Sequence, residues 1–333
     1  MVDNRWGFDK NIDAYSLFMA IDIFVREIGV LPSFPIRTSS KLLDKSHKLE
    51  LISENPKEYF EPFEMGVSAL HFTRNLEMFE RHGKKIFVFD KRQMFLSAMS
   101  SLELPVSNYE IVENIKGNSI GTFYFGLCEI EEIIFPNNKK PFWFDYIGAE
   151  TFLYSPIVSL ISQFAEVKIK KAWLWKKGNG KQIFNQFYKT VSKAKQATEE
   201  NKKEIEYSIA NAAIKSLYTE FVGYLRKDEN AESNFAKKYY RPDIRGLIVS
   251  NAIANFIRNI ISVYDKTGLK PFGISHDAAF YLANDLKEFE GTCLTDEKKF
   301  SFEYSINKKE FFNGLELKGN LSDIEKAGKN GEK

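Results

Sequence analysis

Two carboxylates, Asp90 and Asp277, have the type and setting needed for metal-dependent chemistry. Asp90 ends the short β-rich run KIFVFD, and Asp277 lies in GISHDAAFYLAND, where two apolar runs resemble the strands of a hairpin. Carboxylates on adjacent strands can hold two divalent ions about 4 Å apart, which activate an attacking hydroxyl and stabilise a leaving pyrophosphate. Oxygen ligands suit Mg²⁺ or Mn²⁺, and Mg²⁺ completes its shell with water and substrate phosphates. We therefore expect Asp90 and Asp277 to be metal ligands and catalytic residues.

Each carboxylate also has a simpler explanation. Asp90 could cap the helix that follows it, and Asp277 could be an ordinary turn residue. The run Ser275, His276 and Asp277 does not suit a hydrolase triad, because triad members converge from separated positions and neighbours on a strand face opposite ways. The four histidines and two cysteines form neither a zinc pattern nor a disulfide framework.

The elements around these residues alternate between strand and helix patterns. Apolar periodicity predicts a helix over 14–28, a strand over 85–90 followed by a helix, one or two strands over 118–135, a helix over 155–164 and an alternating strand over 167–175.

The second half of the chain begins with two long helical patterns between 178 and 225, separated by the polar run KAKQATEEN. A further helix is expected to start after Pro242 and to stop near Gly268, and the hairpin with Asp277 follows. The runs FSFEYSI and KKEFFNGLEL resemble short strands, and the polar tail is typical of disorder.

Composition limits the class of protein. The chain has 333 residues, 44% of them hydrophobic, so it can bury one large core or two modest ones. No uninterrupted apolar run approaches eighteen residues, and nothing suggests export or membrane insertion. With only Cys128 and Cys293 available for disulfides, a reducing cytoplasmic location is expected.

Three segments together resemble the palm motifs of family B DNA polymerases. DKRQMFLSAMSSLELP is similar to the first motif, with Asp90 as the metal ligand and Phe95 where the family has an aromatic against the ribose 2′ position. NAAIKSLYTEF is similar to the second motif on the fingers helix, with Tyr218 in register. SHDAAFY aligns with the third motif, and Asp277 falls on its metal-binding Asp. The resemblance covers about residues 85 to 312 and is nearest to protein-primed replicases.

The chain also departs from these motifs. The lysine that grips the triphosphate is replaced by Asn211, the glycine after the tyrosine by Thr219, and the first Asp of the hairpin by Ser275. Lys202, Lys203 and Lys215 are candidates to supply the missing cation, and with Phe95 and Tyr218 they form the expected nucleotide-binding set. Aromatic residues at helical spacing, such as Phe95 and Tyr218, are more often core residues than parts of a binding site.

The resemblance implies an α+β fold, in which a polymerase palm, an antiparallel sheet with packed helices, carries both carboxylates. The implied domains are an N-terminal region of unknown role (1–84), a first palm part (85–177), helical fingers (178–225), a second palm part (226–290), a small thumb-like region (291–320) and a disordered tail (321–333).

The implied activity is template-directed DNA polymerisation from dNTPs with Mg²⁺ or Mn²⁺. Initiation could be primase-like or protein-primed, replication partner proteins could take part, and a plasmid, virus or other mobile element is the expected setting. The first eighty residues are too short for a proofreading exonuclease, so editing is expected to be absent. The alternative is an accessory DNA-binding protein of replication or telomeres that kept the palm and lost its chemistry.

A lysine-rich segment predicts a nucleic-acid partner. Residues 166–203 contain eleven lysines against three acids, a local balance of +8, with aromatic residues interleaved. Lysines neutralise backbone phosphates, and aromatic faces stack on unpaired bases. A solvated lysine face is the simpler alternative. The expected DNA-binding residues are Lys170, Lys171, Trp173, Trp175, Lys176, Lys177, Lys181, Lys308 and Lys309, the last two because KKEFF resembles a later family motif that contacts the primer terminus.

Overall fold

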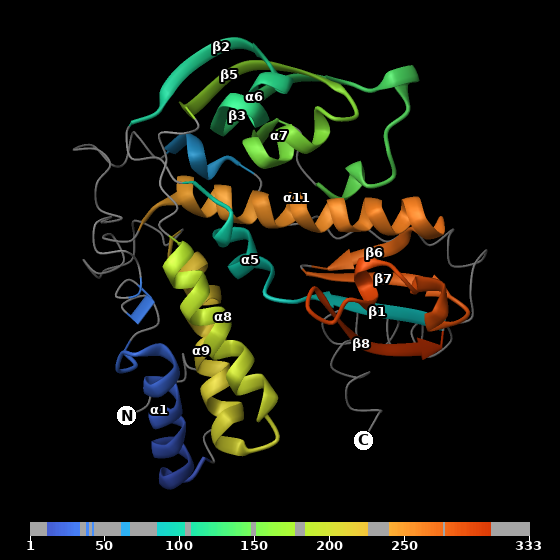
Figure 1. The fold of residues 1–333 in the computed structure, drawn as a ribbon. Helices are drawn as coiled ribbons and strands as arrows, with labels where there is room; N and C mark the ends of the chain where they lie inside the picture. The colour runs from blue at the N-terminus through green and yellow to red at the C-terminus, as the bar shows by residue number, and fades with distance from the viewer. Residues whose placement is uncertain are drawn as a thin grey trace, which may run out of the picture. The chain divides into compact units, whose positions relative to one another are not determined.

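The computed structural model describes residues 12–33, 38–39, 42, 61–66, 85–103, 108–147, 151–176, 184–225, 240–275 and 277–307. The chain forms two compact units (Figure 1). The first unit comprises residues within 1–66, 95–132 and 152–251, and the second comprises residues within 67–94, 133–151 and 252–333. Helices and antiparallel sheets occur together, so the fold is α+β, as the sequence predicted.

The second unit contains the four-stranded sheet β6-β7-β1-β8. Its strands are β1 (Lys85–Lys91), β6 (Pro271–Ser275), β7 (Ala278–Ala283) and β8 (Phe300–Asn307). Strand β1 lies between β7 and β8, and both pairings are antiparallel. The predicted strand over 85–90 and the hairpin of β6 and β7 are therefore confirmed. β8 falls within the predicted thumb-like region but belongs to this sheet.

Buried aromatic rings fix this sheet. Phe89 lies 4.9 Å from the ring of Phe289 and 6.1 Å from that of Tyr281, both edge-on. Every residue of β7 is buried, so its run reads as continuously apolar rather than alternating. The second unit also contains short 3₁₀ helices: η2 (Pro136–Asn138), η3 (Phe144–Tyr146), η4 (Leu286–Phe289) and η5 (Cys293–Thr295).

Helix α11 (Pro242–Thr267) begins at a proline and ends before Gly268, whose φ of 70° is accessible to glycine at little cost. The predicted bounds of this helix are confirmed. Within the second unit, its Phe256 ring packs 6.2 Å from that of Phe300. By length and composition α11 could span a membrane, but most of its apolar stretch is buried within the protein, as in the core helix of a globular domain.

The first unit contains the sheet β2-β5-β3-β4 and the helices that pack on it. The strands are β2 (Glu110–Lys116), β3 (Tyr124–Ile134), β4 (Phe152–Tyr154) and β5 (Glu166–Lys176). Helices α6 (Gly117–Phe123) and α7 (Ser155–Ile161) lie against this sheet in Figure 1. The predicted helix over 155–164 and strand over 167–175 are confirmed with small changes of boundary.

The prediction of strand throughout 118–135 is wrong in its first part, because α6 occupies those residues. Gly121 explains the difference: a Cβ at this position would come within 2.1 Å of Ser159 Oγ on α7. Glycine therefore lets the two short helices approach closely, an effect that apolar periodicity does not reveal.

Three further helices belong to the first unit: α1 (Ala14–Ile28), α8 (Asn185–Glu200) and α9 (Ile205–Tyr224). The helical hairpin of α8 and α9, against which α1 lies in Figure 1, is confirmed. Its break was predicted too early, because residues 193–200 continue α8 and the chain turns at 201–204. Thr198 is fully buried and bonds the carbonyl of Ala194, so this polar run is one face of a packed helix.

Candidate functional site

The two predicted metal ligands lie at adjoining positions of the second unit. In the register of β1 and β7, Asp90 stands opposite Ala278, the residue after Asp277. The Lys91 N–H donates to the Asp277 carbonyl at 2.7 Å. From the spacing of antiparallel ladders, this register puts the Cα atoms of Asp90 and Asp277 about 6 Å apart.

The direction of the Asp277 side chain is not determined by the alternation of side chains along β7. Within a regular ladder, Asp277 would share a face with Lys91, and Asp90 would face the other way. However, β7 begins only at Ala278, and Asp277 belongs to the turn before it. Both carboxylates are half-buried. A turn residue beside a strand end can therefore direct its side chain to the same side as Asp90, as a shared pair of ions requires.

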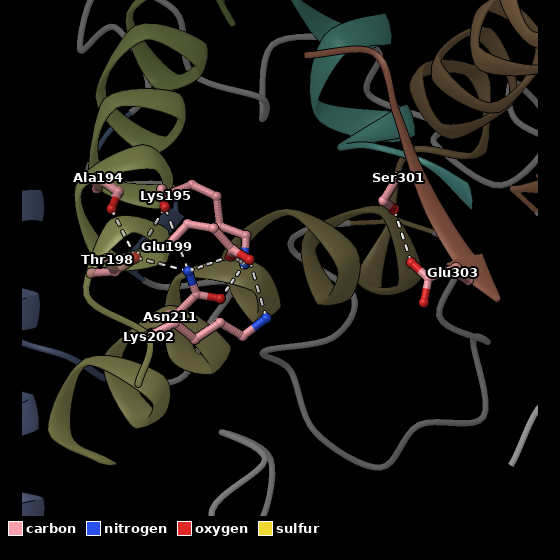
Figure 2. A network of polar contacts seen from close by, with 8 residues as sticks. All are labelled: Ala194, Lys195, Thr198, Glu199, Lys202, Asn211, Ser301 and Glu303. Atoms are coloured by element: carbon pink, nitrogen blue, oxygen red, sulfur yellow. Dashed lines mark hydrogen bonds and ion pairs between the residues drawn. The ribbon is translucent and has the colours of Figure 1, made fainter. Parts of the chain in front are cut away.

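A third acid, Glu303, lies on the opposite neighbour of β1. Ser301 of β8 stands opposite Asp90, and the register shifts between Val88 and Phe89 so that Glu303 is an extra, bulged residue. The Ser301 Oγ donates to Glu303 Oε1 at 2.8 Å (Figure 2). β-Bulges often re-aim side chains beside functional sites. Glu303 was not predicted from the sequence, where its only signal is an acid within the strand run FSFEYSI.

Among the described residues, no group of three or more His, Cys, Asp or Glu side chains could hold a metal ion. Two carboxylates from neighbouring backbone positions fit hard divalent ions only if water and substrate phosphates complete the shell, which is the usual arrangement for Mg²⁺. The donor chemistry of Asp90 and Asp277 therefore suits a magnesium site that forms together with its substrate.

Lys91 puts a positive charge next to Asp90 in the same strand. Burial lowers the pKa of the Lys91 ammonium, and the charge of Lys299 lowers it further. The Lys91 Nζ lies 4.7 Å from the centre of the Phe300 ring, a cation–π contact. Lys91 thus interacts with the aromatic core of the sheet through its side chain and with Asp277 through its backbone.

Phe95, the expected ribose-sensing residue, lies half-buried on α5 (Met94–Ser100). Helix α5 is held by Asn251, whose Nδ2 donates to the carbonyl of Ala98 at 2.9 Å and to Ser101 Oγ at 3.1 Å. These bonds join α5 to α11 within the first unit. The helix predicted after Asp90 is confirmed, and the role of Phe95 remains a prediction.

Asn211, which replaces the expected motif lysine, is the centre of a polar network between α8 and α9 (Figure 2). Its side chain is only 3% exposed. Its Nδ2 donates to Thr198 Oγ1 at 2.9 Å and to Glu199 Oε2 at 3.1 Å, and its Oδ1 accepts a bond from Lys195 Nζ. The network fixes the register of the two helices.

Lys195 was not among the predicted site residues, although the structure places its ammonium beside Asn211. Its Nζ lies 3.6 Å from Glu199 Oε2, and its side chain is 13% exposed. Burial, together with the charges of Lys202 and Lys215, lowers the pKa of Lys195 to about 8 despite the opposing effect of the Glu199 carboxylate. No local motif marks Lys195, because it meets Asn211 only through the packing of two helices.

The other expected nucleotide-binding residues have different environments. Lys202 is exposed in the turn after α8 and lies 3.2 Å from Glu199 Oε1, and Lys203 is exposed beside it. Lys215 is exposed on α9. Tyr218 is only 4% exposed in the core of the first unit, so its ring contributes to packing here.

The lysine-rich segment is less positive than its sequence suggests. Lys168 lies 2.8 Å from Glu132, and Lys170 lies 2.7 Å from Glu129, acids carried by β3. The +8 balance counted neighbours along the chain and omitted these partners across the sheet. Such exposed pairs are weak, so phosphate groups could still compete for Lys170.

The remaining members of the expected DNA-binding set divide into three groups. Lys176 is exposed, and Lys171 Nζ lies 5.1 Å from the Trp173 ring centre. Trp173 and Trp175 are 6% and 3% exposed, so the structure does not support base stacking on these two rings. Trp175 stacks instead on Phe63 at 5.4 Å. The other members, Lys177, Lys181, Lys308 and Lys309, lie outside the described residues.

Comparisons with known proteins give matches among solved structures. No family model matches the chain, and no curated protein matches it. Phi29 DNA polymerase, in an orthorhombic crystal form, is similar with a TM-score of 0.52 and 12% identity, over 88% of this chain and 53% of that chain. Phi29 DNA polymerase complexed with single-stranded DNA is similar with a TM-score of 0.50 and 11% identity, over 86% of this chain and 55% of that chain.

The chain thus spans about half the length of the phi29 DNA polymerase that it matches. At such low identity the likeness concerns the fold alone. The fold of this protein is distantly similar to that of a DNA polymerase.

Proposed function

We propose that this protein is a template-directed DNA polymerase that adds deoxynucleotides to a 3′-hydroxyl, or to a priming hydroxyl, by two-metal catalysis. The observation that carries the proposal is the register that brings Asp90 and Asp277 to adjoining positions in one antiparallel sheet. The similarity to the fold of a DNA polymerase covers 88% of this chain and supports the same proposal.

In this proposal Asp90 and Asp277 hold the metal ions, and the sheet positions both side chains. Two bound Mg²⁺ or Mn²⁺ ions would supply Lewis acidity at the attacking hydroxyl and at the leaving phosphates. The buried rings around Phe89 keep β1 and β7 in one register, and the bond from the Lys91 N–H holds the turn that carries Asp277. Catalysis of this kind depends mainly on positioning and charge stabilisation, which a rigid sheet provides.

The remaining roles follow from the same proposal. Phe95 would exclude ribonucleotides by contact with a 2′-hydroxyl. The exposed lysines near β5, with Lys308 and Lys309, would neutralise template and primer phosphates, so DNA affinity should fall steeply with salt. The family resemblance adds two further parts to the proposal. Initiation would be primase-like or protein-primed, and the protein would replicate a mobile element.

Primer extension by the full chain with Mg²⁺ or Mn²⁺ tests this function. Asp90→Asn and Asp277→Asn remove one negative charge each at nearly constant shape, and each should lower incorporation at least about a hundredfold, because a lost ligand removes transition-state stabilisation. Asp265→Asn is the matched control, because Asp265 is exposed on α11 within the second unit. It should leave incorporation within about twofold, the scale of a surface substitution.

The outcomes separate the polymerase from an accessory DNA-binding protein. Incorporation that disappears in both carboxylate variants, with unchanged DNA binding, supports the proposed chemistry. DNA binding by the wild type without any incorporation would favour the accessory. Incorporation that survives both substitutions would exclude Asp90 and Asp277 as the catalytic metal ligands.

A further inference from the structure

A group of lysines and aromatic rings in the second unit lies outside the site of Asp90 and Asp277. Lys270 comes immediately before β6, and its Nζ lies 5.1 Å from the centre of the Phe142 ring and 5.0 Å from that of Tyr264. The two ring centres lie 4.8 Å apart, with a tilt of 54° between the planes. The Lys270 ammonium is thus held over two aromatic rings, each of which attracts a cation.

The rings of Phe142 and Tyr264 are accessible to solvent. Both side chains are half-buried. The next two side chains after Phe142, Trp143 and Phe144, are only 2% and 3% exposed. The segment is fixed to the sheet by Tyr146, whose buried hydroxyl donates to the backbone carbonyl at the start of β6 at 2.8 Å. Phe142 therefore keeps an accessible ring surface on a segment whose other aromatic residues enter the core.

Two more lysines come from the tight turn that precedes Phe142. Asn137 and Asn138 have left-handed backbones, with φ of 56° and 54°, a conformation that asparagine adopts more readily than most residues. Lys139 and Lys140 follow directly, and both are exposed. We call Lys139, Lys140, Phe142, Tyr264 and Lys270 the lysine–aromatic patch.

The positive charge of this patch exceeds the nearby negative charge. Residues 139–146 and 264–270 contain four lysines against two acids, Asp145 and Asp265. Within the part of the chain that the structure describes, no carboxylate forms an ion pair with Lys139 or Lys270. The patch thus differs from β5, where acids of β3 pair with two of the lysines.

The lysine–aromatic patch lies at the opposite end of β6 from Asp277. From Lys270 to Ser275, the last residue of β6, the extended chain spans about 16 Å. Asp277 comes two residues further on, in the turn that leads to β7. A ligand on the patch is therefore distinct from a nucleotide that reacts beside Asp277.

We propose that the lysine–aromatic patch binds an unpaired strand of nucleic acid. Aromatic rings stack on unpaired bases of any sequence, and lysines neutralise the phosphates of the same strand. Phe142 and Tyr264 provide the ring surfaces for this mode of binding. An acidic peptide would use the lysines but leave the rings without a stacking partner. This surface is separate from the proposed polymerase function, because binding here needs neither a metal ion nor a nucleotide.

Photo-cross-linking on the full chain without metal locates the strand. The probes are a short oligothymidylate that carries 5-iododeoxyuridine and a short oligouridylate that carries 5-iodouridine, which cross-link to aromatic rings stacked on the base. Cross-links at Phe142 or Tyr264, identified by mass spectrometry, are expected with at least one probe, and the probe that binds more tightly identifies the strand as DNA or RNA. Cross-links only at other residues would overturn the proposal.

Affinity measurements separate stacking from charge. By fluorescence anisotropy, Phe142→Leu should weaken oligothymidylate binding at least about fivefold without changing its salt dependence, because the ring carries no charge. Lys139→Gln and Lys270→Gln should each reduce the slope of log affinity against log salt by about 0.7, the contribution of one phosphate contact on a single strand. Lys298→Gln is the matched control, because Lys298 is exposed in the same unit outside the patch, and it should change the slope by less than about 0.2.

The remaining outcomes are equally decisive. Wild-type affinity and salt slope in folded Phe142→Leu, Lys139→Gln and Lys270→Gln proteins, checked by circular dichroism, would overturn the proposal. Binding of poly-glutamate that depends on Lys139 and Lys270, without oligonucleotide binding, would also overturn it and assign the patch to an acidic protein. Strand binding at the patch in a protein that incorporates no nucleotide would support it, so this proposal and the polymerase function can fail separately.

Discussion

At the scale of single residues, the charge on Lys195 opposes folding at neutral pH. The folded chain holds this ammonium at a pKa of about 8, against an ordinary value of 10.5. Burial raises the pKa of the neighbouring Glu199 carboxyl, but hydrogen bonds from Lys202 and Asn211 and the charge of Lys195 outweigh this and keep it below its usual value. The Lys195 ammonium thus lies beside the Glu199 carboxylate and the Asn211 amide, and the charges of Lys202 and Lys215 contribute to its lowered pKa.

This arrangement predicts how stability depends on pH. Below pH 8 Lys195 is protonated in both states, whereas between pH 8 and 10.5 only the unfolded chain keeps the proton. Stability must rise with pH wherever the unfolded state binds more protons. Relative to Lys195→Met, the wild type should gain up to roughly 3 kcal/mol between pH 7.5 and pH 10.5. Urea unfolding of both proteins at these pH values measures the difference, and a constant difference would show that the ammonium is not buried.

Residues at strand ends could be predicted, but residues that meet through packing could not. Asp90 and Asp277 were marked by the apolar runs before and after them, and their adjoining positions follow from the strand and the hairpin. Lys195 and Glu303 had no such mark: Lys195 faces Asn211 across two helices, and Glu303 owes its position to a bulge. The buried Trp175 shows the converse, because strand alternation could not tell a covered aromatic face from an exposed one.

At the scale of elements, long apolar patterns and the capping residues at their ends predicted helix bounds reliably. Helices α1 and α11 have the bounds that their caps indicate: the Asp13 side chain accepts from Ser16 N–H at α1, and Pro242 and Gly268 limit α11. The short elements were not predicted correctly. β2 was not predicted, since its exposed, charged residues give an edge strand little apolar pattern, and α6 was taken for strand.

The glycines of the first unit provide a test of the close contact between α6 and α7. Gly121→Ala should destabilise the protein by about 1–3 kcal/mol, because its new methyl group would overlap Ser159 on α7. Gly223→Ala is the matched substitution on α9, where a Cβ meets no atom within 4 Å, and it should stabilise by about 0.5–1 kcal/mol. Thermal unfolding reports both. A harmless Gly121→Ala would show that α6 and α7 are not in close contact.

At the scale of the whole molecule, the two units divide the proposed chemistry. The second unit holds both carboxylates, and the first holds the helical hairpin of α8 and α9 with the expected nucleotide-binding residues Lys202, Lys203 and Lys215. The polymerase-like fold was within reach of the sequence because three motifs occur in the family's order, even though Asn211, Thr219 and Ser275 depart from them. The surface charge of β5 could not be predicted from the sequence, because acids on the neighbouring strand β3 pair with two of its lysines.

In the proposed mechanism, Asp90 and Asp277 bind the same pair of metal ions. Mn²⁺ binding, followed by electron paramagnetic resonance on the full chain with primer-template DNA and an unreactive nucleotide analogue, tests it directly. Ligands of one shared pair act as a unit, so Asp90→Asn, Asp277→Asn and the double variant should lose nearly equal Mn²⁺ affinity, and each should lose the signal of two coupled ions. Independent, additive losses, or unchanged Mn²⁺ affinity in either single variant, would contradict it.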